Sequence, residues 1–348
     1  MQIYKIKMTN HPEMVVKNEV SLHPVMKKES IRSFIRSWML VIGMVTGASA
    51  YLVYHAIPAI HFCGPALDKT MSVIQPSLLF AMLFLTFCRI EPRDMRPHRW
   101  QIWLLLIQTG LYAILSLILI AFPESGMRCA IEAAMLCMIC PTATACAVVT
   151  GRLGGSMAGV LSYTVLINLL VAVLIPLMVP LTNPMEGLDF MTASALILAK
   201  VFPLLILPCV LAWIVRYVFP RLHARLLAYT DLSFYIWAVS LTLAIAMSTR
   251  YIVRNEDSQM QLAAIAAASA ICCAFQFWAG RRIGRRYGCE ITAGQALGQK
   301  NTVFAIWVGY TFLTPIVSVA GGFYSIWHNC FNTWQLRRME QQKGNQKQ

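Results

Sequence analysis

Long apolar stretches alternate with short polar and basic segments along the chain. Residues 103–122 and 156–181 are the clearest of these stretches. Each is long enough to cross the hydrocarbon core of a bilayer, which takes about 20 residues in an α-helix. Lipid offers the backbone no hydrogen-bond partners, so uninterrupted apolar segments must be helical. The pattern therefore predicts an all-α polytopic membrane protein.

The apolar stretches predict about ten transmembrane helices. The expected spans are residues 37–57, 70–88, 100–122, 129–150, 156–181, 190–218, 228–249, 259–279, 289–313 and 315–336. A loop near residue 185 divides them into two halves of five helices each. Because five is odd, equivalent helices of the two halves run in opposite directions, which is the inverted-repeat plan of many secondary transporters.

The expected organisation has four parts. Residues 1–36 form an N-terminal tail, residues 37–181 the first repeat, residues 190–336 the second repeat and residues 337–348 a C-terminal tail. With an even number of crossings, both tails lie on the same side of the membrane.

Composition and charge support this plan and give it an orientation. The chain is 58% hydrophobic and 13% charged, whereas soluble domains carry about 25% charged residues. Of the 29 Lys and Arg residues, 23 fall in the tails and in the loops on the same side as the tails. By the positive-inside rule both termini are cytoplasmic. The net charge of +14 therefore reflects orientation in a lipid bilayer, and no nucleic-acid partner is expected. The short loops and the lack of a signal peptide favour a bacterial inner membrane.

Two predicted helices, the fourth of each half, carry matching interruptions. Residues 140–145 read Cys-Pro-Thr-Ala-Thr-Ala, in which Pro141 removes a backbone donor. Residues 294–302 contain Gly298, amide side chains and Lys300 within an otherwise apolar segment. Unwound backbone at membrane depth is tolerated only inside the protein or along a cavity. These breaks predict a binding site near the midplane.

The last predicted helix carries the motif Gly-Gly-Phe-Tyr-Ser-Ile-Trp-His-Asn at residues 321–329. With Cys-Pro-x-x-Thr at 140–144 and Gly-x-x-Asn at 298–301, the chain resembles the bile acid:sodium symporter family over residues 38–338. The resemblance implies ten helices in two inverted repeats, a panel domain and a core domain, with helices four and nine broken and crossing. It also implies that Thr144 and Asn301 contact substrate at the crossing, where Thr142, Gln299 and Lys300 lie beside them.

The sodium ligands of that family are mostly replaced in this chain. By alignment with the family, one sodium site falls on Cys146, Ala147, Val160, Thr164 and Ala296, which offer few of the oxygens that sodium requires. For the second site, a helix-three glutamine is retained as Gln108, but a helix-nine glutamine is replaced with Lys300. We expect a protein without sodium coupling, metal or other cofactor, in which the Lys300 ammonium takes the place of the cation and donates to Gln108 and to freed carbonyls.

Lys300 has two further candidate roles. A charge near the bilayer centre is costly unless it faces a cavity or a partner, and burial lets a lysine exchange its proton. Lys300 could therefore carry a proton or attract the substrate anion directly.

Other intramembrane polar residues have simpler interpretations. Lys200 is expected to extend towards the interface, and Glu132 to lie at a helix start, where the helix dipole favours an acid. Asn168 is expected to form hydrogen bonds between helices. His328 and Asn329 are expected to have structural roles, as are Pro141 and Gly298 at the breaks.

The leading functional hypothesis is alternating-access transport of a small organic anion, which the resemblance extends to bile acids, steroid conjugates, keto acids and pantoate-like acids. A proton antiporter, with protons as the partner, and a non-transporting membrane sensor are the alternatives. An intramembrane enzyme is disfavoured, because the sequence contains no His-Glu-x-x-His run, paired intramembrane aspartates or Gly-x-Ser-x-Gly motif. The specific substrate, the direction of transport and the oligomeric state stay open.

Overall fold

The computed structural model describes residues 23–91, 93, 96–229, 232–254 and 259–345, and throughout these residues the chain is helical without a β-strand. Residues 1–41 and 42–348 form two compact units, and every contact given below lies within the second. Residues 1–22 of the expected N-terminal tail lie outside the described part of the chain.

Thirteen α-helices and two short 3₁₀ segments make up the described chain. They are α1 (His23–Ala56), η1 (Pro58–Cys63), α2 (Gly64–Cys88), α3 (Arg99–Ala121), α4 (Arg128–Ile139), α5 (Cys146–Arg152), α6 (Met157–Thr182), α7 (Phe190–Val218), α8 (Pro220–Ala228), α9 (Leu232–Arg254), α10 (Gln259–Arg286), α11 (Glu290–Gly298), α12 (Thr302–Phe312), η4 (Pro315–Ser318) and α13 (Val319–Asn345).

Six helical segments of the described chain are long and apolar enough to cross a membrane. They are Pro58–Cys88, Arg99–Ala121, Met157–Thr182, Phe190–Val218, Leu232–Arg250 and Gln259–Arg286. Many large apolar side chains on them are exposed, including Leu106 and Leu117 on α3 and Leu196 and Leu207 on α7. Apolar surface this extensive is typical of protein that faces lipid rather than water.

N-cap side chains mark the first residue of two of these helices, α6 and α7. The Ser156 side chain accepts a hydrogen bond from the Gly159 amide at the start of α6, and the Asp189 carboxylate accepts from the Met191 and Thr192 amides at the start of α7. Both are N-cap arrangements that satisfy amides left free in the first helical turn. They fix where the chain re-enters the apolar region on each side.

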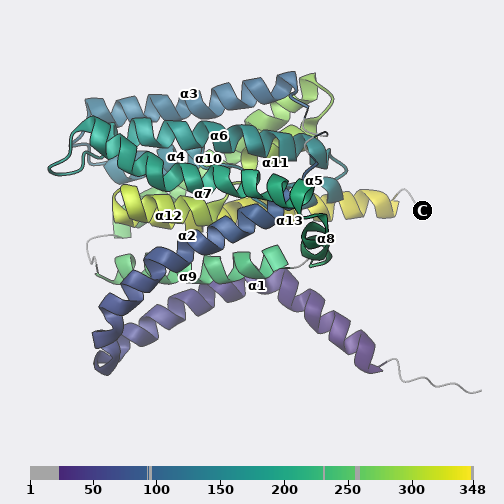
Figure 1. Ribbon diagram of the computed structural model, residues 1–348, viewed down its shortest axis with the longest axis horizontal. Coiled ribbons are helices and arrows are strands. Elements are labelled where there is room, and N and C mark those ends of the chain that lie inside the picture. Colours follow the sequence, from purple (N-terminus) through teal and green to yellow (C-terminus); the bar gives the residue numbers. More distant parts are fainter. Residues whose placement is uncertain (1–22, 92, 94–95, 230–231, 255–258, 346–348) are drawn as a thin grey trace, which may run out of the picture. The chain divides into compact units, whose positions relative to one another are not determined.

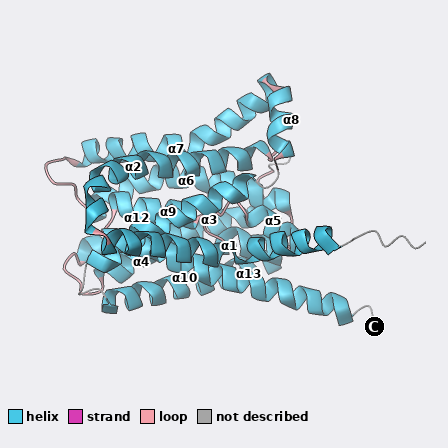
Figure 2. Cartoon of the chain, turned by 90° about the horizontal axis from the view of Figure 1, so that it is seen from below, coloured by secondary structure: helices cyan, strands magenta, loops and turns pink. Residues whose placement is uncertain are grey.

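The helices of residues 42–348 pack in two groups. Helices α3, α4, α5, α6, α10, α11, α12 and α13 form one group through their mutual contacts, and α2 packs against α7 and α9 in the other. Figures 1 and 2 show α3, α6 and α7 running roughly along one direction, with the short α8 lying across them, and in Figure 1 α2 is inclined to them. Contacts between α6 and α7 and between α2 and α12 join the two groups.

Several predicted helix ends were misplaced. Helix α1 already begins at His23, inside the expected tail, while α10 continues to Arg286 and α13 to Asn345. The short helix α8, which carries Arg221 and Arg225, was assigned to a loop. Hydropathy marks where a segment leaves the apolar region, but a helix can continue into the polar layer, where charged side chains remain hydrated.

Candidate functional site

Two interrupted helices approach each other in the middle of the structure. Helix α4 ends at Ile139 and α5 begins at Cys146, while α11 ends at Gly298 and α12 begins at Thr302. Both gaps lie where the sequence predicted them. The Asn301 side chain accepts a hydrogen bond from the Phe304 amide and so caps the start of α12.

The two gaps are joined through their backbones. The Ala143 amide donates to the Gln299 carbonyl at 3.0 Å, and the Asn301 amide donates to the Pro141 carbonyl at 2.8 Å. Thr142 and Lys300 thereby form an isolated antiparallel β-bridge. Backbone groups released from helical hydrogen bonds need other partners when buried, and each gap supplies them to the other. This pairing holds the two chain breaks face to face.

Side chains of the first break also bind to carbonyls of the second. The Cys140 thiol contacts the Asn301 carbonyl at 2.9 Å, and the Thr142 hydroxyl donates to the Ala296 carbonyl at 2.9 Å. The Cys146 thiol contacts the Gln295 carbonyl at 3.2 Å. The Thr142 hydroxyl and the Cys146 thiol are therefore used within the protein.

Gln108 on α3 supports the end of α4 instead of binding Lys300. Its amide nitrogen donates to the Ile139 and Cys140 carbonyls at 3.2 and 3.1 Å, and its amide oxygen accepts from the Tyr163 hydroxyl at 2.8 Å. The prediction that the Lys300 ammonium donates to Gln108 and to freed carbonyls is thus wrong, because no described residue accepts a hydrogen bond from it. The amide is already occupied by carbonyls that the break at Pro141 sets free.

A second amide and a second tyrosine approach from the opposite side. The Gln276 amide nitrogen on α10 donates to the Cys137 carbonyl at 3.2 Å and also contacts the Tyr324 hydroxyl at 3.1 Å. Tyr324 on α13 donates to the Gly298 carbonyl at 2.8 Å. The ends of α4 and α11 are therefore both satisfied by side chains from neighbouring helices.

Lys300 lies at the centre of this arrangement. Its side chain is 1% exposed, and no described residue provides its ammonium with a hydrogen-bond partner. Four buried thiols lie within electrostatic range of the ammonium, those of Cys137, Cys140, Cys146 and Cys272. A buried charge that lacks a partner is costly. The Lys300 ammonium can thus donate hydrogen bonds to a bound ligand, or it can release a proton.

The remaining candidates at the crossing differ in access. Asn301 and Gln299 are 3% and 2% exposed, and Thr144 is half-buried. The side-chain amide of Gln299 donates to the Gln295 side chain, whereas the side-chain nitrogen Nδ2 of Asn301 lacks a partner among the described residues. Asn301 and Lys300 therefore both retain unused donors.

The residues aligned with the sodium sites have few free oxygens. The Thr164 hydroxyl donates to the Val160 carbonyl one turn earlier in α6. Cys146, Ala147 and Ala296 are buried in the apolar core.

Of the residues expected to have structural or packing roles, Asn168 lies in α6, and His328 and Asn329 lie in α13. The Asn329 amide donates to the Ser325 carbonyl at 2.7 Å, and the His328 ring packs edge-on against Tyr324. Asn168 is 1% exposed, and neither end of its amide has a partner among the described residues. The predicted interhelical hydrogen bond of Asn168 is therefore not formed in this structure.

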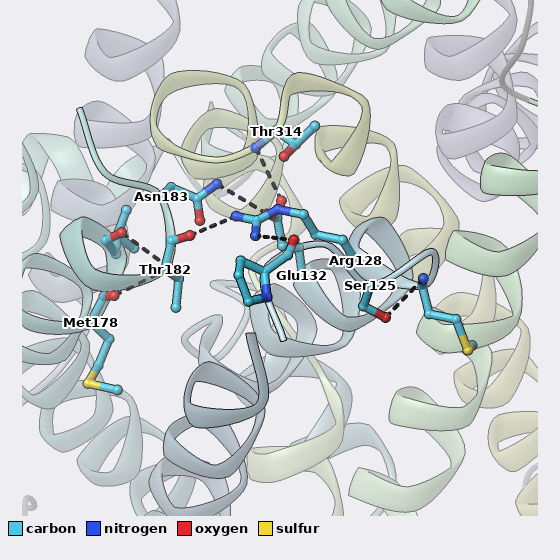
Figure 3. A network of polar contacts seen from close by, with 10 residues as sticks. Ser125, Arg128, Glu132, Met178, Thr182, Asn183 and Thr314 are labelled. Carbon is cyan, nitrogen blue, oxygen red and sulfur yellow. Dashed lines mark hydrogen bonds and ion pairs between the residues drawn. The ribbon is translucent and has the colours of Figure 1, made fainter. Parts of the chain in front are cut away.

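Glu132 is part of a polar network and does more than interact with a helix dipole. Its carboxylate is fully buried and accepts hydrogen bonds from the Asn183 amide at 3.1 Å and the Thr314 backbone amide at 3.2 Å. Arg128 pairs with it at 3.0 Å and donates to the Thr182 carbonyl at 2.7 Å. Figure 3 shows these groups converging on the carboxylate. The start of α4 is thereby joined to the end of α6 and to the segment after α12.

An ion pair holds the start of α11, the end of this helix that is farther from Lys300. Glu290 accepts hydrogen bonds from Arg281 and Arg285 of α10, each at 3.0 Å. The Arg285 guanidinium, followed by that of Arg281, holds the pKa of Glu290 below its usual value. Gly288 permits the preceding turn because its φ is +66°.

Sequence reasoning assigned no role to four further residues, Tyr163, Gln276, Tyr324 and Gln295. All four are buried polar residues within helices next to the crossing. Their polarity inside apolar segments was the available signal, because such residues usually form hydrogen bonds across helices. Which groups they bind depends on how the helices pack.

Comparison of the chain with known proteins gave no match to a family model and none to a curated protein.

Proposed function

We propose that this protein is a secondary transporter of a small organic anion and that it works without sodium. The observation that carries the proposal is the buried Lys300 ammonium between two broken helices, with no hydrogen-bond partner among the described residues. Broken helices near the midplane are the usual location of binding sites in secondary transporters. An anion that reached this point would satisfy both the ammonium and the free side-chain nitrogen of Asn301.

The inverted-repeat arrangement is supported by two matched pairs of side chains. Gln108 pairs with Tyr163, and Gln276 pairs with Tyr324. The two glutamines come from the third helix of each predicted half and the two tyrosines from the fifth. The proposal treats the group of α3, α4, α5, α6, α10, α11, α12 and α13 as the core domain and α2, α7 and α9 as the panel domain, the two domains that the resemblance implies.

Lys300 takes the role of the coupling cation in this proposal. The ammonium is covalently attached to the chain, whose backbone is held here by the bridge between Thr142 and Lys300, so it cannot dissociate as sodium does. Binding of the substrate anion then neutralises a charge that is costly to bury. This would favour movement of the core relative to the panel once substrate is bound.

Thermal stability of the purified protein tests the proposal. The protein is heated with each of a panel of organic anions, including taurocholate, pantoate and pyruvate, with sodium or potassium as the only cation. We expect at least one anion to raise the melting temperature equally in both salts, because binding to the folded state stabilises it. The shift should be lost in Lys300→Gln and kept in the control Lys69→Gln.

Two results would count against the proposal. A shift that requires sodium would show that the ammonium has not replaced the cation. No shift with any anion, together with proton flux in liposomes that Lys300→Gln abolishes, would favour proton antiport. That second candidate is supported by the same unpartnered amine, since a buried lysine exchanges its proton readily.

A further inference from the structure

The short helix α8 begins where a long apolar helix ends. Helix α7 ends at Val218, and it is one of the six helices long and apolar enough to cross a membrane. Phe219 is not helical, and Pro220 opens α8 at a position that needs no amide donor. Figures 1 and 2 show α8 lying across α7 rather than continuing it. A helix that turns across the end of a membrane-crossing segment lies along the membrane surface.

One side of α8 is fixed to the protein. His223 is 8% exposed, and its ring nitrogen Nε2 donates to the Cys88 carbonyl, at the end of α2, at 2.8 Å. Leu226, three residues later on the same side, packs against the apolar core. Arg216 of α7 pairs with Glu91, close to Cys88 in the chain. The ends of α2 and α7 therefore set the position of α8.

The opposite side of α8 carries unpaired positive charge. Arg221 and Arg225 are four residues apart and so share one face, and each lies about 200° around the helix from His223. Both are exposed, and neither has an ionic or hydrogen-bonding partner among the described residues. The chain contains no Asp or Glu from residue 190 to residue 230. Two guanidinium groups one turn apart suit a phosphate, which arginine binds with paired hydrogen bonds.

Large apolar and aromatic side chains border this basic face. Phe219 and Leu222 are 54% and 47% exposed, and Tyr217 and Tyr229 are 63% and 64% exposed. Such side chains are costly to leave in water, and aromatic rings gather at the level of lipid headgroups. A basic face with an apolar border is typical of helices that lie in the membrane interface and bind anionic lipid.

We propose that α8 binds an anionic phospholipid, in which Arg221 and Arg225 contact the headgroup phosphate and Phe219 and Leu222 contact the upper part of the acyl chains. A free phosphate ion would use only the two arginines, so the apolar border favours a lipid. The inference does not rest on the proposed transport function. Because His223 ties α8 to α2, the bound lipid also holds the ends of α2 and α7 at the membrane surface.

A fluorophore on α8 reports which lipid lies beside it. Ala224 is exposed and precedes Arg225, and Ala224→Cys is made in a background in which serine replaces the cysteines that are not buried, namely Cys63, Cys129, Cys289 and Cys330. The labelled protein is placed in phosphatidylcholine vesicles with added phosphatidylglycerol or phosphatidylcholine that carries a nitroxide high on one acyl chain. Quenching gives the relative association constant of the two lipids. Both leaflets have the same composition, so the result does not depend on orientation. Ala228→Cys provides a second labelling position.

The preference for phosphatidylglycerol over phosphatidylcholine is the readout. We expect at least about fivefold in the otherwise unmodified protein, the effect of one basic residue near an anionic surface. Arg221→Gln combined with Arg225→Gln should reduce the preference to less than about twofold, whereas lysine at both positions should keep most of it. The control, Arg282→Gln combined with Arg286→Gln, removes two exposed arginines that are also one turn apart, on α10, and should leave the preference unchanged.

Three results would overturn the inference. The first is no preference for phosphatidylglycerol before any arginine is replaced. The second is an equal loss of preference in the α8 and α10 variants, because the effect would then come from net charge and not from α8. The third is displacement of the nitroxide lipid by inorganic phosphate at an ionic strength matched with chloride, which would indicate a site for a free anion. Failure of the transport proposal would alter none of these measurements.

Discussion

At the scale of single residues, the protein buries charge in two contrasting ways. Glu132 is fully buried and has three hydrogen-bonding or ionic partners. Lys300 is equally buried and has none among the described residues. A satisfied buried charge contributes to structure, whereas an unsatisfied one is retained at a cost to stability. We therefore expect the two residues to respond in opposite directions to substitution.

Lys300→Met should raise the free energy of unfolding by on the order of 2 kcal/mol, because it removes an unpartnered charge and keeps a side chain of similar length. The same variant should lose anion-dependent stabilisation. Thermal melting with and without anion measures both effects. A variant that melts below wild type would mean that the ammonium is paired in the native protein.

Glu132→Ala should lower the free energy of unfolding by about 3–5 kcal/mol, because it leaves Arg128 without its ionic partner and two amides without their acceptor. The exposed Glu186, on the loop after α6, provides the control, and Glu186→Ala should change stability by less than about 0.5 kcal/mol. Denaturant titration in detergent compares them. Equal changes in the free energy of unfolding for the two substitutions would show that the Glu132 network does not stabilise the protein.

At the scale of helices, close backbone approach holds α10 against α11. A Cβ at Gly280 would lie 2.5 Å from the Ala293 carbonyl oxygen, so even one methyl group must push the helices apart. At Gly110 on α3, in contrast, a Cβ would meet nothing within 4 Å. The two glycines thus distinguish close packing from mere helix propensity.

Gly280→Ala should destabilise the protein by about 1–3 kcal/mol through overpacking. Gly110→Ala should stabilise it by about 0.5–1 kcal/mol, because alanine loses less backbone entropy on helix formation. The melting temperatures of the two variants therefore move in opposite directions from wild type. If both rose, the contact between α10 and α11 would be looser than in this structure.

The ion pair at the start of α11 makes its stabilisation depend on pH. The folded-state pKa of Glu290 lies below its ordinary value of 4.5. The contribution of the carboxylate is therefore complete above that pH and is lost as the pH falls through the folded value. At pH 7, Glu290→Gln should lower the free energy of unfolding by up to about 1 kcal/mol. The variant should therefore melt slightly below wild type. The difference should vanish on acidification, and a difference that persisted unchanged would exclude the ion pair as its cause.

At the scale of the whole molecule, orientation in the membrane is a prediction from the distribution of charge. Basic residues in α8 and at the end of α10 lie on the side predicted to be cytoplasmic. Cys63 ends η1 on the opposite side, and Cys289 lies in the turn before α11. Both thiols are partly exposed, so they report which side each loop faces.

In variants that retain only one of these two cysteines, a membrane-impermeant maleimide should label Cys63 in right-side-out vesicles and Cys289 in inside-out vesicles. The positive-inside rule is the physical reason, because loops rich in Lys and Arg stay in the cytoplasm. Gel-shift detection of the labelled protein gives the answer. The reverse pattern would invert the predicted topology.

The sequence alone determined the helical class, the approximate helix positions and the two breaks. These features depend on neighbouring residues, because apolar runs must hydrogen-bond within themselves in lipid and Pro141 or Gly298 weakens a helix locally. Helix ends were less well predicted, since hydropathy does not mark where a helix stops in the polar layer.

Only the tertiary structure decided which groups meet. Gln108 binds carbonyls more than 30 residues away, Glu132 accepts from Thr314 at a separation of 182 residues, and Lys200 joins Gln75 in one cavity. Such pairings depend on how the helices pack, which no local pattern encodes. For the same reason, the sequence placed Lys300 within an apolar segment, but only packing decided that its ammonium lacks a partner in the described chain.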